Sequence, residues 1–90
     1  MKTVKKKILP EYYTSVQAGN KTFELRKDED NINVGDILEL KEWNGNNFTG
    51  RKIRAAVTYV LRDCKQYGLM DGHCIIGFRL ISEVIKMKNP

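Results

Sequence analysis

Hydrophobic and polar residues alternate along much of the chain, which predicts short β-strands joined by turns. The strictest alternation covers residues 22–26, with Phe23 and Leu25 on one side and polar side chains on the other. The longest covers residues 51–61, where apolar residues recur from Ile53 onward. Further strands are expected at residues 4–9, 37–43 and 73–81, and residues 83–88 either extend the last strand or fold back.

One short helix is expected between the first two strands. Pro10 ends the first strand, and proline suits the first turn of a helix. Tyr12, Tyr13 and Val16 then follow at helical spacing, which predicts a helix over residues 11–18. At least one of the two tyrosines is expected in the core.

The turns between these elements complete a prediction of fold class. Residues 44–47 have the Asn-Gly chemistry of a tight hairpin, and residues 63–72 are expected to form a loop with at most one helical turn. The whole chain, residues 1–90, is therefore expected to be a single α+β domain. About five or six strands would close into a small barrel with the helix packed beside it. The predicted core consists of Phe23, Leu25, Leu38, Leu40, Ile53, Val57, Cys74, Ile76 and Phe78.

Composition limits where this domain is expected to be found and which metals or cofactors it is expected to bind. No apolar run approaches the roughly 20 residues of a membrane span, and the basic N-terminus lacks the apolar stretch of a signal peptide. We therefore expect a cytoplasmic protein without a membrane partner. Cys64 and Cys74 lack the spacing of a zinc site and are expected to be buried, reduced thiols. No metal or organic cofactor is expected.

The positive charge suits a phosphate-rich partner. Sixteen Lys and Arg residues outnumber eleven Asp and Glu residues, which gives a net charge of +5. Positive surface raises affinity and encounter rate for polyanions. Residues 5–7 are three consecutive lysines, which either contact phosphate or protect an edge strand from aggregation.

The segment between Lys21 and Asp36 holds the most informative polar residues. Lys21, Glu24 and Arg26 lie close together at the start of one predicted strand. Arg26 can fork a phosphate or a base edge, Glu24 can accept from an amino group, and Lys21 adds a mobile charge. The competing interpretation is a solvated strand face with a weak ion pair, worth well under about 1 kcal/mol.

Aromatic and basic residues elsewhere are secondary candidates. Tyr12 and Trp43 can each stack on a base or cover the core. Arg51 and its basic neighbours point in mixed directions along one strand, so they do not establish a continuous stripe. His73 has no evident partner for acid–base catalysis.

Four segments together resemble a known family. They are Lys-Ile-Leu-Pro-Glu-Tyr-Tyr at residues 7–13, Gly-x-Lys-Thr-x-Glu-x-Arg at 19–26, Val-Gly-Asp at 34–36 and Thr-Gly-Arg at 49–51. In this order they resemble the ASCH domains of the PUA-like superfamily, closest to a small, uncharacterised bacterial and phage branch. The resemblance covers residues 7–78.

The resemblance implies a β-barrel with a helix beside it and a cleft between them, in which RNA or modified bases are proposed to bind. One ASCH branch hydrolyses acetylcytidine with a Lys and a Thr of this stretch and a distant Glu. Lys21 matches that Lys, but Glu24 occupies the position of the Thr, and no counterpart of the distant Glu is evident. The residues expected to bind a ligand are Lys21, Thr22, Glu24, Arg26, Asp36, Tyr12 and Arg51.

Three functions of different classes follow as hypotheses. The first is a non-catalytic RNA- or nucleotide-binding domain with its ligand between helix and barrel. The second is an amidohydrolase that acts on an acylated nucleoside such as acetylcytidine, with Lys21 as the catalytic residue. The third is a protein-interaction module.

Overall fold

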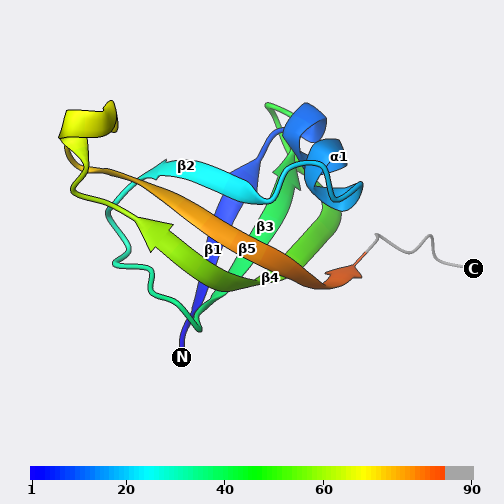
Figure 1. Ribbon diagram of the computed structural model, residues 1–90. Coiled ribbons are helices and arrows are strands. Elements are labelled where there is room, and N and C mark those ends of the chain that lie inside the picture. Colours follow the sequence, from blue (N-terminus) through cyan, green and yellow to red (C-terminus); the bar gives the residue numbers. More distant parts are fainter. Residues whose placement is uncertain (85–90) are drawn as a thin grey trace, which may run out of the picture.

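The computed structural model describes residues 1–84 (Figure 1). Within them the chain forms one α-helix, one 3-10 turn and five strands, which confirms the α+β class. The elements are β1 (Thr3–Ile8), α1 (Pro10–Gln17), β2 (Phe23–Lys27), β3 (Ile37–Trp43), β4 (Phe48–Leu61), η1 (Lys65–Tyr67) and β5 (His73–Val84). The predicted continuation over residues 85–88 lies outside the described residues.

The five strands form one mixed, curved sheet in the order β1-β3-β4-β5-β2. β1 runs parallel to β3, and the other neighbouring pairs are antiparallel. A parallel pair needs a long crossover, and α1 and β2 lie in that connection. The expected closed barrel is wrong in one respect: β1 and β2 are edges that do not pair, so the sheet is a half-barrel with an open seam.

The core fills the inner face of the half-barrel and the underside of the helix. Tyr13 and Val16 of α1 are fully buried, while Tyr12 is 47% exposed, as expected for one core tyrosine. Burial of apolar side chains from every strand except β2 stabilises this arrangement. The core prediction is confirmed for Leu38, Leu40, Ile53, Val57, Cys74, Ile76 and Phe78.

For β2, the predicted alternation is confirmed, but the prediction of which face is buried is wrong. Phe23 and Leu25 are 48% and 58% exposed, whereas Glu24 between them is 5% exposed. A period of two residues defines two faces but does not say which face points inward. Here the inner face is polar because two cations, Lys21 and Arg26, pair with the buried carboxylate of Glu24.

A second correction concerns the outer half of β4. The alternation over residues 51–61 predicts that Tyr59 and Leu61 share a face with the buried Ile53 and Val57, but they are 64% and 38% exposed. The register with β5 shifts between Val57 and Tyr59, as at a β-bulge, and the bulge reverses the facing of the residues that follow. Val60 packs against the core instead.

Cys64 and Cys74 are both buried, which confirms their expected burial. Across residues 1–84, no helix has the length and apolar character needed to cross a membrane.

Candidate functional site

A cavity of about 410 Å³ opens at the seam between the two edge strands, beside the start of the helix. Figure 1 shows α1 at the end of the half-barrel where β1 ends and β2 begins. We call this cavity the seam cleft. Its lining residues are Lys7, Ile8, Leu9, Tyr12, Lys21, Phe23, Glu24, Leu25 and Arg26.

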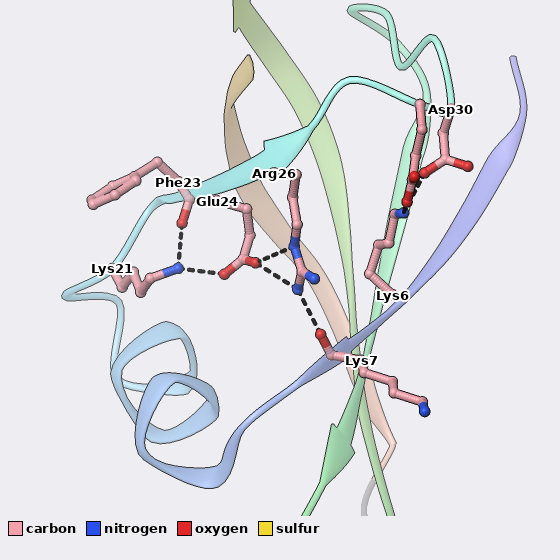
Figure 2. A network of polar contacts seen from close by, with 8 residues as sticks. Lys6, Lys7, Lys21, Phe23, Glu24, Arg26 and Asp30 are labelled. Atoms are coloured by element: carbon pink, nitrogen blue, oxygen red, sulfur yellow. Dashed lines mark hydrogen bonds and ion pairs between the residues drawn. The ribbon is translucent and has the colours of Figure 1, made fainter. Parts of the chain in front are cut away.

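Glu24 lies at the centre of a polar network in the cleft (Figure 2). One carboxylate oxygen, Oε1, pairs with Lys21 Nζ, which also donates to the carbonyl oxygen of Phe23 at 2.6 Å. The other, Oε2, accepts from Arg26 Nε at 2.9 Å and lies 2.8 Å from Arg26 Nη2. These two ion pairs compensate the burial of the Glu24 carboxylate, whose side chain is only 6% exposed.

Arg26 also bridges the open seam. Its Nη2 donates to the carbonyl oxygen of Lys7 at 2.5 Å, so a β2 side chain is tied to the β1 backbone. The same group therefore contacts Glu24 and the opposite edge, which fixes the plane of the guanidinium. Within residues 1–84, the described hydrogen bonds use Nε and Nη2 and leave Nη1 free to donate to a ligand.

Two half-exposed aromatic rings flank this network. Tyr12 and Phe23 are 47% and 48% exposed. Lys21 Nζ lies 5.7 Å from the Tyr12 ring centroid and 5.1 Å from that of Phe23. The cleft thus combines aromatic surface with hydrogen-bond donors, an acceptor and one excess positive charge among Lys21, Glu24 and Arg26.

The three carboxylates of the acidic loop that follows β2 form ion pairs with two cations of the protein itself. Lys6 forms ion pairs with Glu29 and Asp30, and the hydrogen bond to Asp30 raises the pKa of the Lys6 ammonium. Arg62 clasps Asp28, with Nη2 and Oδ1 3.0 Å apart, and this hydrogen bonding lowers the pKa of the Asp28 carboxyl. The Lys6 contacts therefore join β1 to the loop that follows β2.

Of the predicted ligand-binding residues, Lys21, Glu24, Arg26 and Tyr12 are brought together in the cleft. Thr22 does not line the cleft. It is exposed, and its backbone carbonyl accepts a hydrogen bond from the Phe78 N–H at 3.1 Å.

Asp36 is placed away from the cleft, where it anchors the backbone. It accepts from the N–H groups of Asn33 at 2.9 Å and Lys2 at 3.0 Å. These two hydrogen bonds, led by that from Asn33, lower the pKa of the Asp36 carboxyl. The Val-Gly-Asp segment therefore holds the turn into β3 and the start of β1.

Arg51 is also outside the cleft. Its Nε and Nη2 donate to Glu42 at 3.0 and 2.9 Å, and its guanidinium carbon lies 4.4 Å from the Tyr13 ring centroid. The Arg51 hydrogen bond is the main cause of the lowered pKa of Glu42 and is matched by a raised pKa of Arg51 itself. This pair supports the buried side of the helix.

Sequence reasoning missed several cleft residues. The Lys7 carbonyl became part of the site only through the approach of two edge strands that are distant in sequence. Phe23 and Leu25 were assigned to the core, although their place on the same strict alternation as Glu24 was the signal that one face had to be outside. In the part of the chain that the structure describes, no group of three or more His, Cys, Asp or Glu side chains could hold a metal ion.

Comparison with known proteins identifies relatives of this chain. The family model described as "Domain of unknown function (DUF3850)" matches residues 3–78. A protein of Escherichia phage P2, "Uncharacterized 12.9 kDa protein in GpA 3'region", is 43% identical over 54 residues. The match covers 60% of this chain and 50% of the phage protein, so it spans about half the length of that relative.

Proposed function

The chain belongs to the DUF3850 family, and from its cleft we propose that it is a non-catalytic RNA- or nucleotide-binding domain that holds one nucleotide at the seam. The observation that carries this proposal is the arrangement around Glu24. A buried carboxylate, two cations that bind it, and two half-exposed aromatic rings line one cavity. Nucleotides offer complementary features: a flat base, amino groups and a phosphate.

The size and chemistry of the cleft suit such a ligand. Its volume of about 410 Å³ lies within the roughly 300–1,000 Å³ of typical small-molecule sites. Tyr12 and Phe23 supply ring surface on which a base can stack. Glu24 can accept from a base amino group, and the free Nη1 of Arg26 can donate to a phosphate or a carbonyl.

We further propose that the fold is of the PUA-like type and that the chain is an ASCH domain. The helix beside a curved sheet, with a cleft between helix and edge strands, is the arrangement that the resemblance implies. Lys21 and Arg26 of the shared Gly-x-Lys-Thr-x-Glu-x-Arg segment both line that cleft. An RNA partner also implies a cytoplasmic location, which forms part of the same proposal.

Binding is favoured over hydrolysis by the surroundings of Lys21. A catalytic amine must direct its nitrogen at the reacting atom of the substrate. Lys21 Nζ instead contacts the Glu24 carboxylate and donates to the Phe23 carbonyl. We therefore assign Lys21 to ligand binding. Turnover of acetylcytidine that is abolished by Lys21→Ala would replace this proposal with the amidohydrolase.

Equilibrium binding of ribonucleoside monophosphates tests the proposal. We expect the wild-type protein to bind at least one of them and Arg26→Gln to weaken that binding by about 10- to 100-fold, since a hydrogen bond to a charged group contributes about 1.5–3 kcal/mol. The matched control is Arg79→Gln, because Arg79 is exposed and lies outside the cleft lining. Equal affinity in all three proteins would contradict the proposal. A protein partner that is captured after nuclease treatment, with no nucleotide bound, would support the interaction module.

A further inference from the structure

The outer face of the sheet presents a row of lysines across three neighbouring strands. Lys7 of β1 pairs with Lys41 of β3, and Lys41 pairs with Lys52 of β4. Residues directly opposite each other on neighbouring strands point to the same side of a sheet. The inner side is excluded, because the adjacent pair Leu40 and Ile53 is buried in the core. We call Lys7, Lys41 and Lys52 the lysine row.

The adjoining row adds further positive charge. Lys5, Glu39 and Arg54 are aligned across the same three strands. Glu39 is the single carboxylate of the two rows and lies 3.8 Å from Lys52 Nζ and 3.7 Å from Arg54 Nε. The two rows together therefore carry an excess of four positive charges, formed by Lys5, Lys7, Lys41, Lys52 and Arg54 against Glu39.

This arrangement is unfavourable for the isolated sheet. Like charges directly opposite each other on neighbouring strands repel and destabilise the pairing. In the lysine row two such pairs occur in succession, and the row itself contains no carboxylate. An anionic ligand that lies over the row would relieve this repulsion.

Aromatic contacts hold two of these lysines against the sheet. Lys7 Nζ lies 4.0 Å from the centroid of the Trp43 ring, and Lys41 Nζ lies 4.5 Å from that of Phe48. Trp43 and Phe48 contact each other edge to face at 4.9 Å. Cation–π contacts restrain flexible lysine side chains, so the ammonium groups occupy defined positions on the outer face.

The row is continuous with the seam cleft. The backbone of Lys7 accepts from Arg26 inside the cleft, while its side chain points away from Arg26 toward the outer face (Figure 2). Neighbouring strands lie about 4.8 Å apart, so the lysine row spans roughly 10 Å. A row of this length can lie alongside successive phosphates of one nucleic-acid strand, and each ammonium group can neutralise a phosphate charge.

We propose that the lysine row binds the phosphodiester backbone of a single-stranded RNA whose neighbouring nucleotide occupies the seam cleft. The inference rests on the proposed function for the identity of the ligand. It adds a second contact surface, in which Lys41 and Lys52 lie outside the cleft lining and Lys7 belongs to both surfaces. A mononucleotide would use the cleft alone, whereas an oligonucleotide would use both surfaces.

The test compares two double variants with equal loss of charge. Lys41→Gln/Lys52→Gln removes two charges of the row and leaves the cleft lining intact. Lys27→Gln/Lys65→Gln removes two exposed charges elsewhere and is the control. Affinity for a short single-stranded oligoribonucleotide of mixed sequence is measured between about 50 and 200 mM salt, and affinity for a mononucleotide is measured in parallel. Thermal unfolding establishes that both variants are folded.

We expect the row variant to reduce the slope of log affinity against log salt by about 1.4, because each lost phosphate contact on a single strand removes about 0.7. The control should keep the wild-type slope, and mononucleotide affinity should be unchanged in both. Equal slopes in the two variants would overturn the inference. So would a loss of binding to anionic lipid vesicles without a loss of RNA binding, which would identify a membrane surface.

The proposed function and this inference fail in distinguishable ways. If Arg26→Gln leaves mononucleotide binding unchanged while the row variant weakens oligonucleotide binding, the cleft proposal fails and the lysine row still binds a phosphate backbone. If only the cleft variant has an effect on either ligand, the row proposal fails.

Discussion

Glu24 and Arg26 should be energetically coupled, and a double-mutant cycle measures their coupling energy. The single changes are Glu24→Gln, which is isosteric, and Arg26→Gln, which shortens the side chain; each removes one charge. Each is combined with the other in the double variant. Because both singles alter the same contact, the cycle separates their mutual interaction from the effect of each residue on its other neighbours.

The magnitude follows from the geometry. Arg26 Nε and Nη2 both contact one oxygen of Glu24, at 2.9 and 2.8 Å. A hydrogen bond to a charged group contributes about 1.5–3 kcal/mol. The two contacts share an acceptor and the Arg26 side chain is 26% exposed, so solvent screening lowers the expected coupling to about 1–2 kcal/mol. Because the Glu24 side chain is only 6% exposed, we expect the coupling energy to exceed that of a surface ion pair.

Arg26→Gln should have the larger total effect. It also removes the hydrogen bond to the Lys7 carbonyl, which bridges the two edge strands. We expect a loss of about 2 kcal/mol in the free energy of unfolding, equivalent to a fall in Tm of about 8–16 °C for a domain of this size.

Urea denaturation followed by far-ultraviolet circular dichroism measures all four proteins. The midpoint should shift while the slope with denaturant stays constant, which indicates a change in stability alone. Arg79→Gln again provides the exposed control. A coupling below about 0.3 kcal/mol, within the additivity of independent sites, would refute the conclusion that the buried carboxylate and the guanidinium act as a unit.

Further predictions concern acid stability, packing and thiol chemistry. Because its folded pKa is lowered, Glu42 should stabilise the fold at neutral pH and lose this contribution as pH falls below about 4; Glu42→Gln should flatten the acid limb of a denaturation series. Gly77→Ala should raise stability by about 0.5–1 kcal/mol, because an added Cβ meets Tyr59 at an ordinary 3.6 Å. Burial raises the pKa of the Cys74 thiol, so alkylation should require unfolding. Phe23→Ser should change stability by under about 1 kcal/mol in urea denaturation, since the ring is half exposed.

Two of these predictions have a control variant within the chain. Glu11→Gln removes an exposed carboxylate and should keep the acid limb unchanged. Leu40→Ala should cost about 2–5 kcal/mol in the same denaturation assay that finds Phe23→Ser nearly neutral. A destabilised Gly77→Ala, or alkylation of Cys74 at the same rate in folded and unfolded protein, would contradict the packing described for β5.

Local sequence patterns predicted most of the elements, because period and turn chemistry are local properties. The strand over residues 37–43 and the helix after Pro10 follow directly from them. The facing of β2 did not, because alternation leaves two equivalent choices until partners are known. Burial of the Glu24 carboxylate depends on its ion pairs with both Lys21 and Arg26. The alternation of residues along a strand carries no information about such pairs.

In the candidate site, too, contacts between residues close in sequence were predictable and long-range contacts were not. Lys21, Glu24 and Arg26 are close in sequence, so their meeting was predictable. Asp36 and Arg51 were grouped with them by shared motif, but their hydrogen bonds show that each has a local structural partner instead. The lysine row depends on the register of a parallel pair and an antiparallel pair, which is long-range information.

The central claim is that a nucleotide occupies the seam cleft, and chemical-shift mapping with ribonucleoside monophosphates tests it most directly. The account predicts saturable shifts that cluster on Tyr12 and residues 21–26, with a response at Lys7 and little change at Asp36. Shifts that are absent at low salt, or that cluster away from these residues, would contradict it.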